Sequence, residues 1–283
     1  MEQKKDKMIA YRFFRTILGP VYKFWYNPKI IGAENIPEEG RFIIVGNHIH
    51  IMDQCNVIIA TKRILHYMAK KEYFDPQYKE GHHAWFFRSA GCIPVDRSKK
   101  DEEATHAALE VLENDEALGL FPEGTRNGIK EERMLELYEE YYKDEPISVE
   151  EFKKKLKPNK TSFVNYLEEL MKKNFITKDE FMDNIFQADD YLTMLINENR
   201  ITEEEYYDHI LLPLKFGAVS MAKKTNSVLV PFTITGDYKF RSKNLTVRIG
   251  KPIEPSDDLE KANTHLDEVM KNMIKENHKM NGK

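Results

Sequence analysis

Short apolar runs alternate with amphipathic segments over residues 28–127. Four of these runs are bounded by turn-forming residues and have the length of buried strands, at 41–47, 64–70, 91–96 and 116–124. Residues 101–114 place apolar side chains at helical spacing behind an acidic first turn, which predicts a helix. Because strands that alternate with helices pack in layers, the pattern predicts an α/β fold.

The α/β pattern stops after residue 128 and returns at 212–238 and 245–253, before a predicted final helix near 257–277. Between these parts the chain has no glycine, and its apolar positions follow the helical period. We therefore expect one α/β domain in two parts, 28–128 and 212–283, interrupted by an all-α insertion at 129–211.

The insertion contains an internal repeat, in which residues 166–181 match residues 191–206 and residues 147–152 form a weaker copy. Each copy has a Ser or Thr followed three residues later by Glu, which is the capping-box pattern of a helix start, and apolar residues at the spacing of a hydrophobic staple. The predicted boxes are Thr177 with Glu180, Thr202 with Glu205, and Ser148 with Glu151. The repeat therefore predicts a small helical array.

Composition and charge narrow the classes of function. Apolar residues make up 41% and charged residues 32%, as in a soluble globular protein, and two cysteines, Cys55 and Cys92, suit a reducing compartment. Residues 131–210 carry 21 acidic and 11 basic residues, a net charge of -10, which leaves +6 for the rest of the chain. A mildly basic body suits phosphate groups or an anionic membrane surface. No nucleic-acid partner is expected, because no nucleic-acid motif occurs.

The N-terminal region, 1–27, is rich in aromatic residues interleaved with cations. Arg12, Arg15 and Lys23 interrupt its apolar positions, so it has neither the apolar core of a secretory signal nor the length of a membrane span. One interpretation is an amphipathic helix that lies in a membrane interface. The other is that these aromatic side chains pack on the domain.

The stretch "GNHIHIMDQC" (46–55) places two histidines and an aspartate after an apolar run. On a strand, His48 and His50 would share a face, as paired metal ligands do. A binuclear H-x-H-x-D-H pattern would need an aspartate and a histidine where this chain has Met52 and Gln54. No metal site is therefore expected.

A pairing of His48 with Asp53 is the second interpretation. Residues five apart in a helix are separated by about 140° and cannot face each other. The two meet only if His48 lies at a strand exit and Asp53 enters the next helix, which is where the pattern puts them. Asp53 would then accept the Nδ1–H of His48 and leave Nε2 as a base for a substrate hydroxyl.

Two more motifs supply anion-binding groups. "FPEGTR" (121–126) places Glu123 and Arg126 in a tight turn after a strand, and a guanidinium offers paired donors to phosphate. "GCIPVDR" (91–97) brings Arg97 off another strand end. Two arginines with a His/Asp pair predict a site for a phosphorylated polyol.

With these motifs, the chain resembles the glycerolipid acyltransferases, specifically the bacterial lysophosphatidic acid acyltransferase group. Four family blocks occur in order, "NHIHIMD" (47–53), "GCIPVDR" (91–97), "FPEGTR" (121–126) and "VPFTI" (230–234). The resemblance covers about residues 20–127 and 212–253. It implies a single acyltransferase-type domain with a mixed sheet flanked by helices.

The resemblance also implies site roles. His48 would be the general base and Asp53 its orienter, and Pro231 would shape the acyl pocket. The residues that would bind the glycerol phosphate are Arg97, Glu123, Gly124 and Arg126, and Asn47 and Thr125 would also bind substrate. The implied reaction moves a fatty acyl chain from acyl-CoA or acyl-acyl carrier protein to the free hydroxyl of a lysophosphatidic acid, giving phosphatidic acid without a cofactor. The enzyme would be peripheral (monotopic) on the cytoplasmic face of the cell membrane.

Two departures from the family pattern affect specificity. His50 stands where the family commonly has serine, and the insertion separates "EGTR" from "LKFGA". The acceptor could accordingly be another lysolipid or glycerol phosphate. A different class is a non-catalytic lipid-binding scaffold that presents the insertion. The presence of His48, Asp53, Glu123 and Arg126 together favours an enzyme.

Overall fold

The chain divides into two compact units in the computed structural model, which describes residues 8–77, 84–96, 98 and 101–282. The first unit comprises residues 1–124 and 215–283, and the second comprises residues 125–214. The predicted insertion at 129–211 falls within the second unit.

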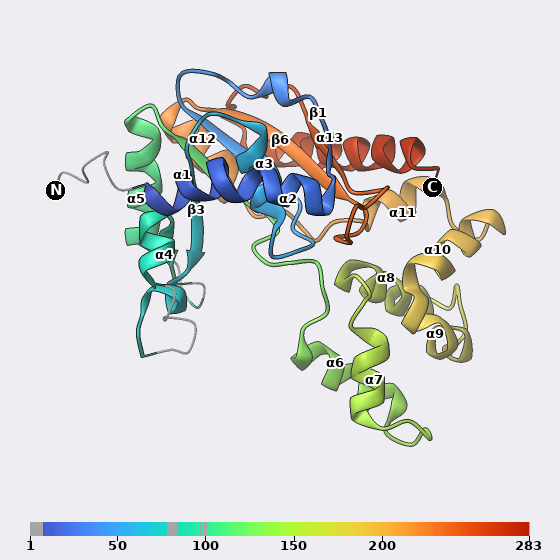
Figure 1. Cartoon of the computed structure of the whole chain (residues 1–283). Helices are drawn as coiled ribbons and strands as arrows, with labels where there is room; N and C mark the ends of the chain where they lie inside the picture. Colours follow the sequence, from blue (N-terminus) through green and yellow to red (C-terminus); the bar gives the residue numbers. More distant parts are fainter. Residues whose placement is uncertain (1–7, 78–83, 97, 99–100, 283) are drawn as a thin grey trace. The chain divides into compact units, whose positions relative to one another are not determined.

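In the described part of the first unit, seven strands form one mixed sheet in the order β1-β7-β6-β2-β5-β3-β4. Figure 1 labels β1, β6 and β3 of this sheet. Strands β6, β2, β5, β3 and β4 run parallel, β7 is antiparallel to β6, and β1 is parallel to β7. The strands are β1 (Lys29–Ile31), β2 (Phe42–Gly46), β3 (Leu65–Lys70), β4 (Ile93–Val95), β5 (Ala117–Leu120), β6 (Val228–Thr235) and β7 (Thr246–Ile249). The predicted α/β fold with a mixed sheet is confirmed.

Helices cover both faces of this sheet. The helical elements of the first unit are α1 (Ile9–Phe13), η2 (Phe14–Leu18), α2 (Gly19–Tyr26), η3 (Ala33–Asn35), α3 (Asp53–Ala60), η4 (Lys71–Phe74), α4 (Ala84–Ser89), α5 (Glu102–Glu113), α12 (Gly217–Thr225) and α13 (Leu259–Met280). Every residue of β2 is buried, as expected of a central parallel strand with helices on both faces.

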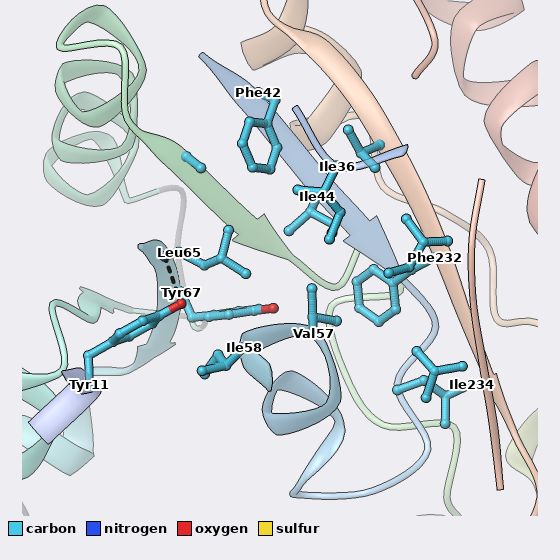
Figure 2. Close-up of a cluster of buried hydrophobic side chains, with 14 of the residues drawn as sticks. Tyr11, Ile36, Phe42, Ile44, Val57, Ile58, Leu65, Tyr67, Phe232 and Ile234 are labelled. Carbon is cyan, nitrogen blue, oxygen red and sulfur yellow. Dashed lines mark hydrogen bonds between the residues drawn. The ribbon is translucent and has the colours of Figure 1, made fainter. Parts of the chain in front are cut away.

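One apolar core lies between the sheet and the helices α1 and α3 (Figure 2). Phe42 and Ile44 of β2 point into this core with Val57 of α3 and Tyr11 of α1. On the other face, α12 packs on β2 and β6, and α13 packs on β6. There, Asn277 of α13 donates its Nδ2 hydrogen to Thr233 Oγ1 over 3.4 Å.

The second unit is helical in its described residues. Its elements are α6 (Glu131–Leu137), η6 (Tyr138–Tyr142), α7 (Val149–Leu156), α8 (Thr161–Lys172), α9 (Lys178–Asn184), η7 (Ile185–Gln187), α10 (Ala188–Asn197) and α11 (Glu203–Asp208). Its own buried side chains include Phe152, Phe163, Phe181 and Leu192.

The predicted helix starts are present. Thr177 and Thr202 form complete capping boxes at α9 and α11. Ser148 makes one of the two hydrogen bonds of a capping box at α7. Its hydroxyl accepts the Glu151 backbone N–H, while the Glu151 carboxylate pairs with Lys155 at 2.9 Å. The predicted third box is therefore half formed.

Candidate active site

The predicted His48–Asp53 pair and the predicted anion-binding residue Glu123 meet at one edge of the sheet. Strand β2 ends at Gly46, two residues before His48, and its parallel neighbour β5 ends at Leu120, just before the turn that contains Glu123. The predicted strand 116–124 is therefore shorter than expected. Strand β2 has β5 on one side and β6 on the other, so the strand order reverses at β2. The site lies at this topological switch point, beyond the carboxyl ends of the strands.

His48 and Asp53 are hydrogen-bonded as the spacing predicted. His48 lies past the end of β2, Asp53 is the first residue of α3, and His48 Nδ1 is 2.8 Å from Asp53 Oδ2. The same oxygen accepts the backbone N–H groups of Ile49 at 2.7 Å and His50 at 2.8 Å. An oxygen that accepts from amides is an acceptor for Nδ1–H as well, which leaves His48 Nε2 unprotonated when the ring is neutral.

Glu123 and Phe121 of the "FPEGTR" turn hold His48 from the side of β5. The nearly buried Glu123 accepts the backbone N–H of His48 on Oε1 over 2.8 Å. The His48 ring stacks on Phe121 with centroids 4.1 Å apart and planes 14° apart. The side chain of His48 remains 16% exposed, whereas Asp53 is fully buried. The turn therefore fixes the ring while its edge stays reachable.

Two glycines make room for the rings beneath the site. A Cβ on Gly119 of β5 would lie 2.4 Å from the ring of Tyr67, which stacks in turn on Phe121 at 5.9 Å. A Cβ on Gly46 would lie 2.4 Å from the ring of Phe232. Side chains at these positions would displace rings that contact Phe121, the ring on which His48 stacks.

The side chain of Asn47 is used inside the fold. It is buried, its Nδ2 donates to the carbonyl of Ile234 at 2.9 Å, and its Oδ1 accepts the Ile234 N–H at 2.7 Å. These bonds continue the pairing of β2 with β6 by one more residue. These contacts give Asn47 a structural role next to His48, and its predicted contact with substrate stays a prediction. Pro231 is buried within β6 opposite Val45.

His50 does not share the environment of His48. Its Nδ1 accepts the backbone N–H of Met52 over 3.2 Å, and its ring stacks on Tyr238 with centroids 4.1 Å apart. His50 is therefore held by a local hydrogen bond and by ring stacking.

A buried polar network behind Asp53 was not predicted. Tyr238 donates its hydroxyl hydrogen to Asp53 Oδ1 over 2.6 Å, and Asn56 Nδ2 donates to the Tyr238 oxygen over 2.7 Å. Tyr22 donates its hydroxyl hydrogen to Asn56 Oδ1 over 3.0 Å. Burial, reinforced by the Asp53 carboxylate, raises the pKa of Tyr238 far above its usual range. Tyr238 therefore acts as a donor at every physiological pH.

The remaining anion-binding residues stand as predictions. Gly124 adopts a positive φ of 72° at the end of the turn, and the side chain of Lys215 passes over it, 2.6 Å from where a Cβ would lie. Lys215 thus brings a cation to the turn that no motif had indicated. Arg97 lies outside the described residues. Thr125 and Arg126 belong to the second unit.

The N-terminal helical segment divides its aromatic residues between two environments. Tyr11 and Tyr22 are buried against the domain. The large apolar side chains exposed on the segment are Ile9, Phe13, Ile17, Leu18, Val21, Phe24 and Trp25. Packing on the domain thus accounts for Tyr11 and Tyr22, while a membrane interface for the exposed side chains stays a prediction. In the part of the chain that the structure describes, no helix is long and apolar enough to cross a bilayer.

Among the residues that have described positions, no three His, Cys, Asp or Glu side chains gather as a metal site would require.

Comparison with known proteins places the chain in a family. The family model described as Acyltransferase matches residues 27–235, which is most of the chain and includes the His48–Asp53 pair. The chain belongs to the acyltransferase family.

Two individual proteins are similar to this chain. The 1-acyl-sn-glycerol-3-phosphate acyltransferase of Bacillus subtilis (strain 168) is 27% identical over 117 residues, which cover 41% of this chain and 57% of that protein. The chain thus matches just over half the length of this curated relative. The crystal structure of the 1-acyl-sn-glycerophosphate (LPA) acyltransferase PlsC from Thermotoga maritima has a similar fold, with a TM-score of 0.51 and 18% identity over 97% of this chain and 83% of that chain.

Proposed function

We propose that the protein transfers a fatty acyl chain from an acyl thioester to the free hydroxyl of 1-acyl-glycerol 3-phosphate, which yields phosphatidic acid for phospholipid synthesis. The observation that carries the proposal is the His48–Asp53 hydrogen bond at the carboxyl edge of the sheet, in a chain of the acyltransferase family. The similarity to a 1-acyl-sn-glycerol-3-phosphate acyltransferase supports this choice of acceptor.

The chemistry follows from the state of the His48 ring. Nε2 removes the proton of the acceptor hydroxyl as its oxygen attacks the thioester carbonyl carbon. The C–O bond forms, the C–S bond breaks, and the thiolate leaves with the proton that the imidazolium returns. Asp53 stabilises the imidazolium between these steps. No cofactor and no covalent acyl-enzyme are needed.

Acceptor recognition uses the cations around the "FPEGTR" turn. Arg126 and Arg97 would bind the phosphate, Gly124 and Thr125 would line the turn, and Lys215 lies over Gly124. Glu123 accepts the backbone N–H of His48 and so ties the turn to the His48 backbone. A guanidinium can give two parallel charge-assisted hydrogen bonds to one phosphate group.

Both substrates carry long apolar chains, so the protein would work at a membrane. The exposed apolar face of the N-terminal helix suits peripheral attachment to the cytoplasmic face of the cell membrane, where basic side chains meet anionic lipids. The acyl donor would be acyl-CoA or acyl-acyl carrier protein.

A matrix of donors and acceptors tests the proposal. Purified full-length protein is incubated with vesicles that contain lysophosphatidic acid, other lysolipids or no acceptor, together with acyl-CoA or acyl-acyl carrier protein. We expect phosphatidic acid to form from lysophosphatidic acid in preference to other products, and His48→Ala to abolish it. Turnover of another lysolipid alone would reassign the acceptor. Lipid binding without turnover in any pair would refute an enzyme and support the scaffold class.

A further inference from the structure

Tyr238 contacts the site pair although it belongs to none of the four sequence motifs. It follows β6 in the chain, and its hydroxyl donates to Asp53 Oδ1 at 2.6 Å. The other oxygen of Asp53 is taken by His48 Nδ1 and two backbone N–H groups. Without Tyr238, Oδ1 would lose this donor in a fully buried place. Tyr238 therefore anchors the side of the carboxylate that His48 does not reach.

The direction of the Tyr238 hydroxyl is set by Asn56. Since Asn56 Nδ2 donates to the Tyr238 oxygen at 2.7 Å, the single hydrogen of that hydroxyl points toward Asp53. Asn56 is itself fully buried and is oriented by the Tyr22 hydroxyl at its Oδ1, 3.0 Å away. Bonds that run in one direction polarise one another, so the chain from Tyr22 to Asp53 acts as a unit.

The network also joins two distant segments. Tyr22 lies on α2, whereas Tyr238 lies in the loop before β7. The exposed Trp25 of α2 packs against Phe240 of that loop, with ring centroids 4.8 Å apart. The Tyr26 ring lies between the two network tyrosines, 4.9 Å from Tyr22 and 5.5 Å from Tyr238. The N-terminal helix therefore helps to seat Tyr238.

We propose that Tyr238 is a positioning residue for the His48–Asp53 pair, seated by Asn56 and by Tyr22 of the N-terminal helix. The inference rests on the proposed acyl transfer. Tyr238 acts through Asp53 and touches neither substrate. Its hydroxyl spreads the negative charge of the carboxylate and keeps Oδ2 aimed at His48.

Tyr238→Phe removes the hydroxyl and keeps the ring that stacks on His50. The expected result is a fall in kcat of about 10-fold, the rate equivalent of one charge-assisted hydrogen bond, with KM for donor and acceptor within about 2-fold of wild type. Because the carboxylate loses a donor, its charge concentrates on the His48 side and favours the imidazolium. The acidic limb of the pH–rate profile should therefore move to higher pH.

Tyr26→Phe is the matched control. It removes a hydroxyl from the same aromatic cluster, and among the described residues no hydrogen bond involves that hydroxyl. We expect wild-type kcat and an unchanged pH profile. Tyr22→Phe, whose hydroxyl is three hydrogen bonds from the Asp53 carboxylate, should give a smaller fall in kcat and a smaller shift in the same direction.

The outcomes separate this inference from the proposed function. A wild-type protein without acyl transfer would refute the proposed function before any variant is compared. With an active wild type, the positioning role is overturned by a Tyr238→Phe protein with unchanged kcat and pH profile, or by equal losses in Tyr238→Phe and Tyr26→Phe. Should Tyr238→Phe fail to fold by circular dichroism, Tyr22→Phe decides, and an unmoved acidic limb there overturns the role.

Discussion

The Nδ1 atom of His48 lies 2.8 Å from Asp53 Oδ2, and the two residues come from the end of a strand and the start of the next helix. His50 is only two residues away, yet its Nδ1 accepts a backbone N–H and its ring is covered by Tyr238. His48 is thus oriented as a base, whereas His50 packs against Tyr238, the tyrosine that donates to Asp53.

His48→Ala should accordingly abolish turnover while the fold survives. Loss of a general base costs on the order of 10²–10⁴-fold in rate. His50→Ala should retain much of the activity, because it removes the stacking on Tyr238 and the acceptor of the Met52 N–H but leaves the His48–Asp53 hydrogen bond in place. Steady-state rates on vesicles check both variants, with circular dichroism as the control for folding. Equal losses that added zinc restores would revive a metal-ion mechanism.

The aromatic layer beneath His48 gives a second prediction. In Gly119→Ala the new Cβ would meet the Tyr67 ring at 2.4 Å, so the ring and Phe121 must shift. We expect a destabilisation of about 1–3 kcal/mol and lower kcat. Urea unfolding and activity measure the two effects.

Gly217→Ala is the matched control for Gly119→Ala. A Cβ there would meet only Met221 Cε at 3.9 Å, and alanine favours a helix. Its stability should equal or exceed that of wild type. Wild-type stability and activity in Gly119→Ala would show that the aromatic layer does not constrain His48.

Sequence reasoning succeeded where the determinants are local. The His48–Asp53 contact follows from five residues of spacing between a strand and a helix, and the boxes at Thr177 and Thr202 follow from a three-residue spacing. The Asp53–Tyr238 bond joins residues 185 apart, and nothing near Tyr238 signals a polar partner. Only the path of β6 past β2 brings that tyrosine to the site.

Other contacts at the site were not predicted because the same residue type can bind a substrate or pair with the backbone. The substrate contact of Asn47 stays a prediction, whereas the pairing of its amide with Ile234, which matches a strand's backbone pattern, was not predicted. Lys215 was overlooked because a lone lysine carries no pattern. Its placement depends on its backbone N–H, which bonds Pro122 O at 2.9 Å.

The phosphate-binding prediction concerns Arg126 and Arg97. Alanine at either position should mainly raise the apparent KM for the acceptor, and Arg126→Lys should rescue only partly, because an ammonium lacks the planar fork. Lys130→Ala, which removes an exposed cation from the same segment, is the control and should leave KM unchanged. Normal acceptor binding with loss of donor affinity alone would reverse the assignment.

The second unit should have an acid-sensitive ion pair. Glu180 accepts from Arg200 at 2.6 Å and from the Thr177 backbone, which lowers its pKa from 4.5 to about 2. A carboxyl whose pKa is lower in the folded state stabilises the fold above its unfolded pKa, and this contribution disappears as the pH falls through the folded value. The free energy of unfolding should therefore decline between pH 4.5 and 2.

Glu180→Gln tests this pair. The variant should be less stable than wild type at pH 7 and should depend less on pH in that window, as measured by chemical unfolding followed by circular dichroism. Glu204→Gln, at an exposed position in the first turn of α11, is the control and should keep the wild-type dependence. An identical pH dependence in wild type and Glu180→Gln would contradict the assignment.

The helical insertion should be removable without loss of the first unit. Where the chain leaves that unit and returns to it, Lys215 N–H bonds Pro122 O at 2.9 Å. Within the second unit, Asn127 Nδ2 donates to the carbonyl of Ile210 over 3.1 Å, so both ends of the insertion are close together. Deleting 131–208 and joining the ends with a short flexible linker should therefore give a folded protein.

The deletion also tells what the insertion does. Its net charge of -10 against +6 for the rest favours either an electrostatic cover for a basic site or a solubilising appendage, and like charge should keep it away from anionic lipid. A cover predicts that the deletion variant binds acceptor more tightly at low salt and that the difference vanishes when salt screens it over about 8 Å. Activity on vesicles across salt concentrations measures this, with His48→Ala in the deletion background as the blank. Unchanged activity and salt dependence would exclude the cover and leave the solubilising appendage as the interpretation. An unfolded product would refute the independence of the two units.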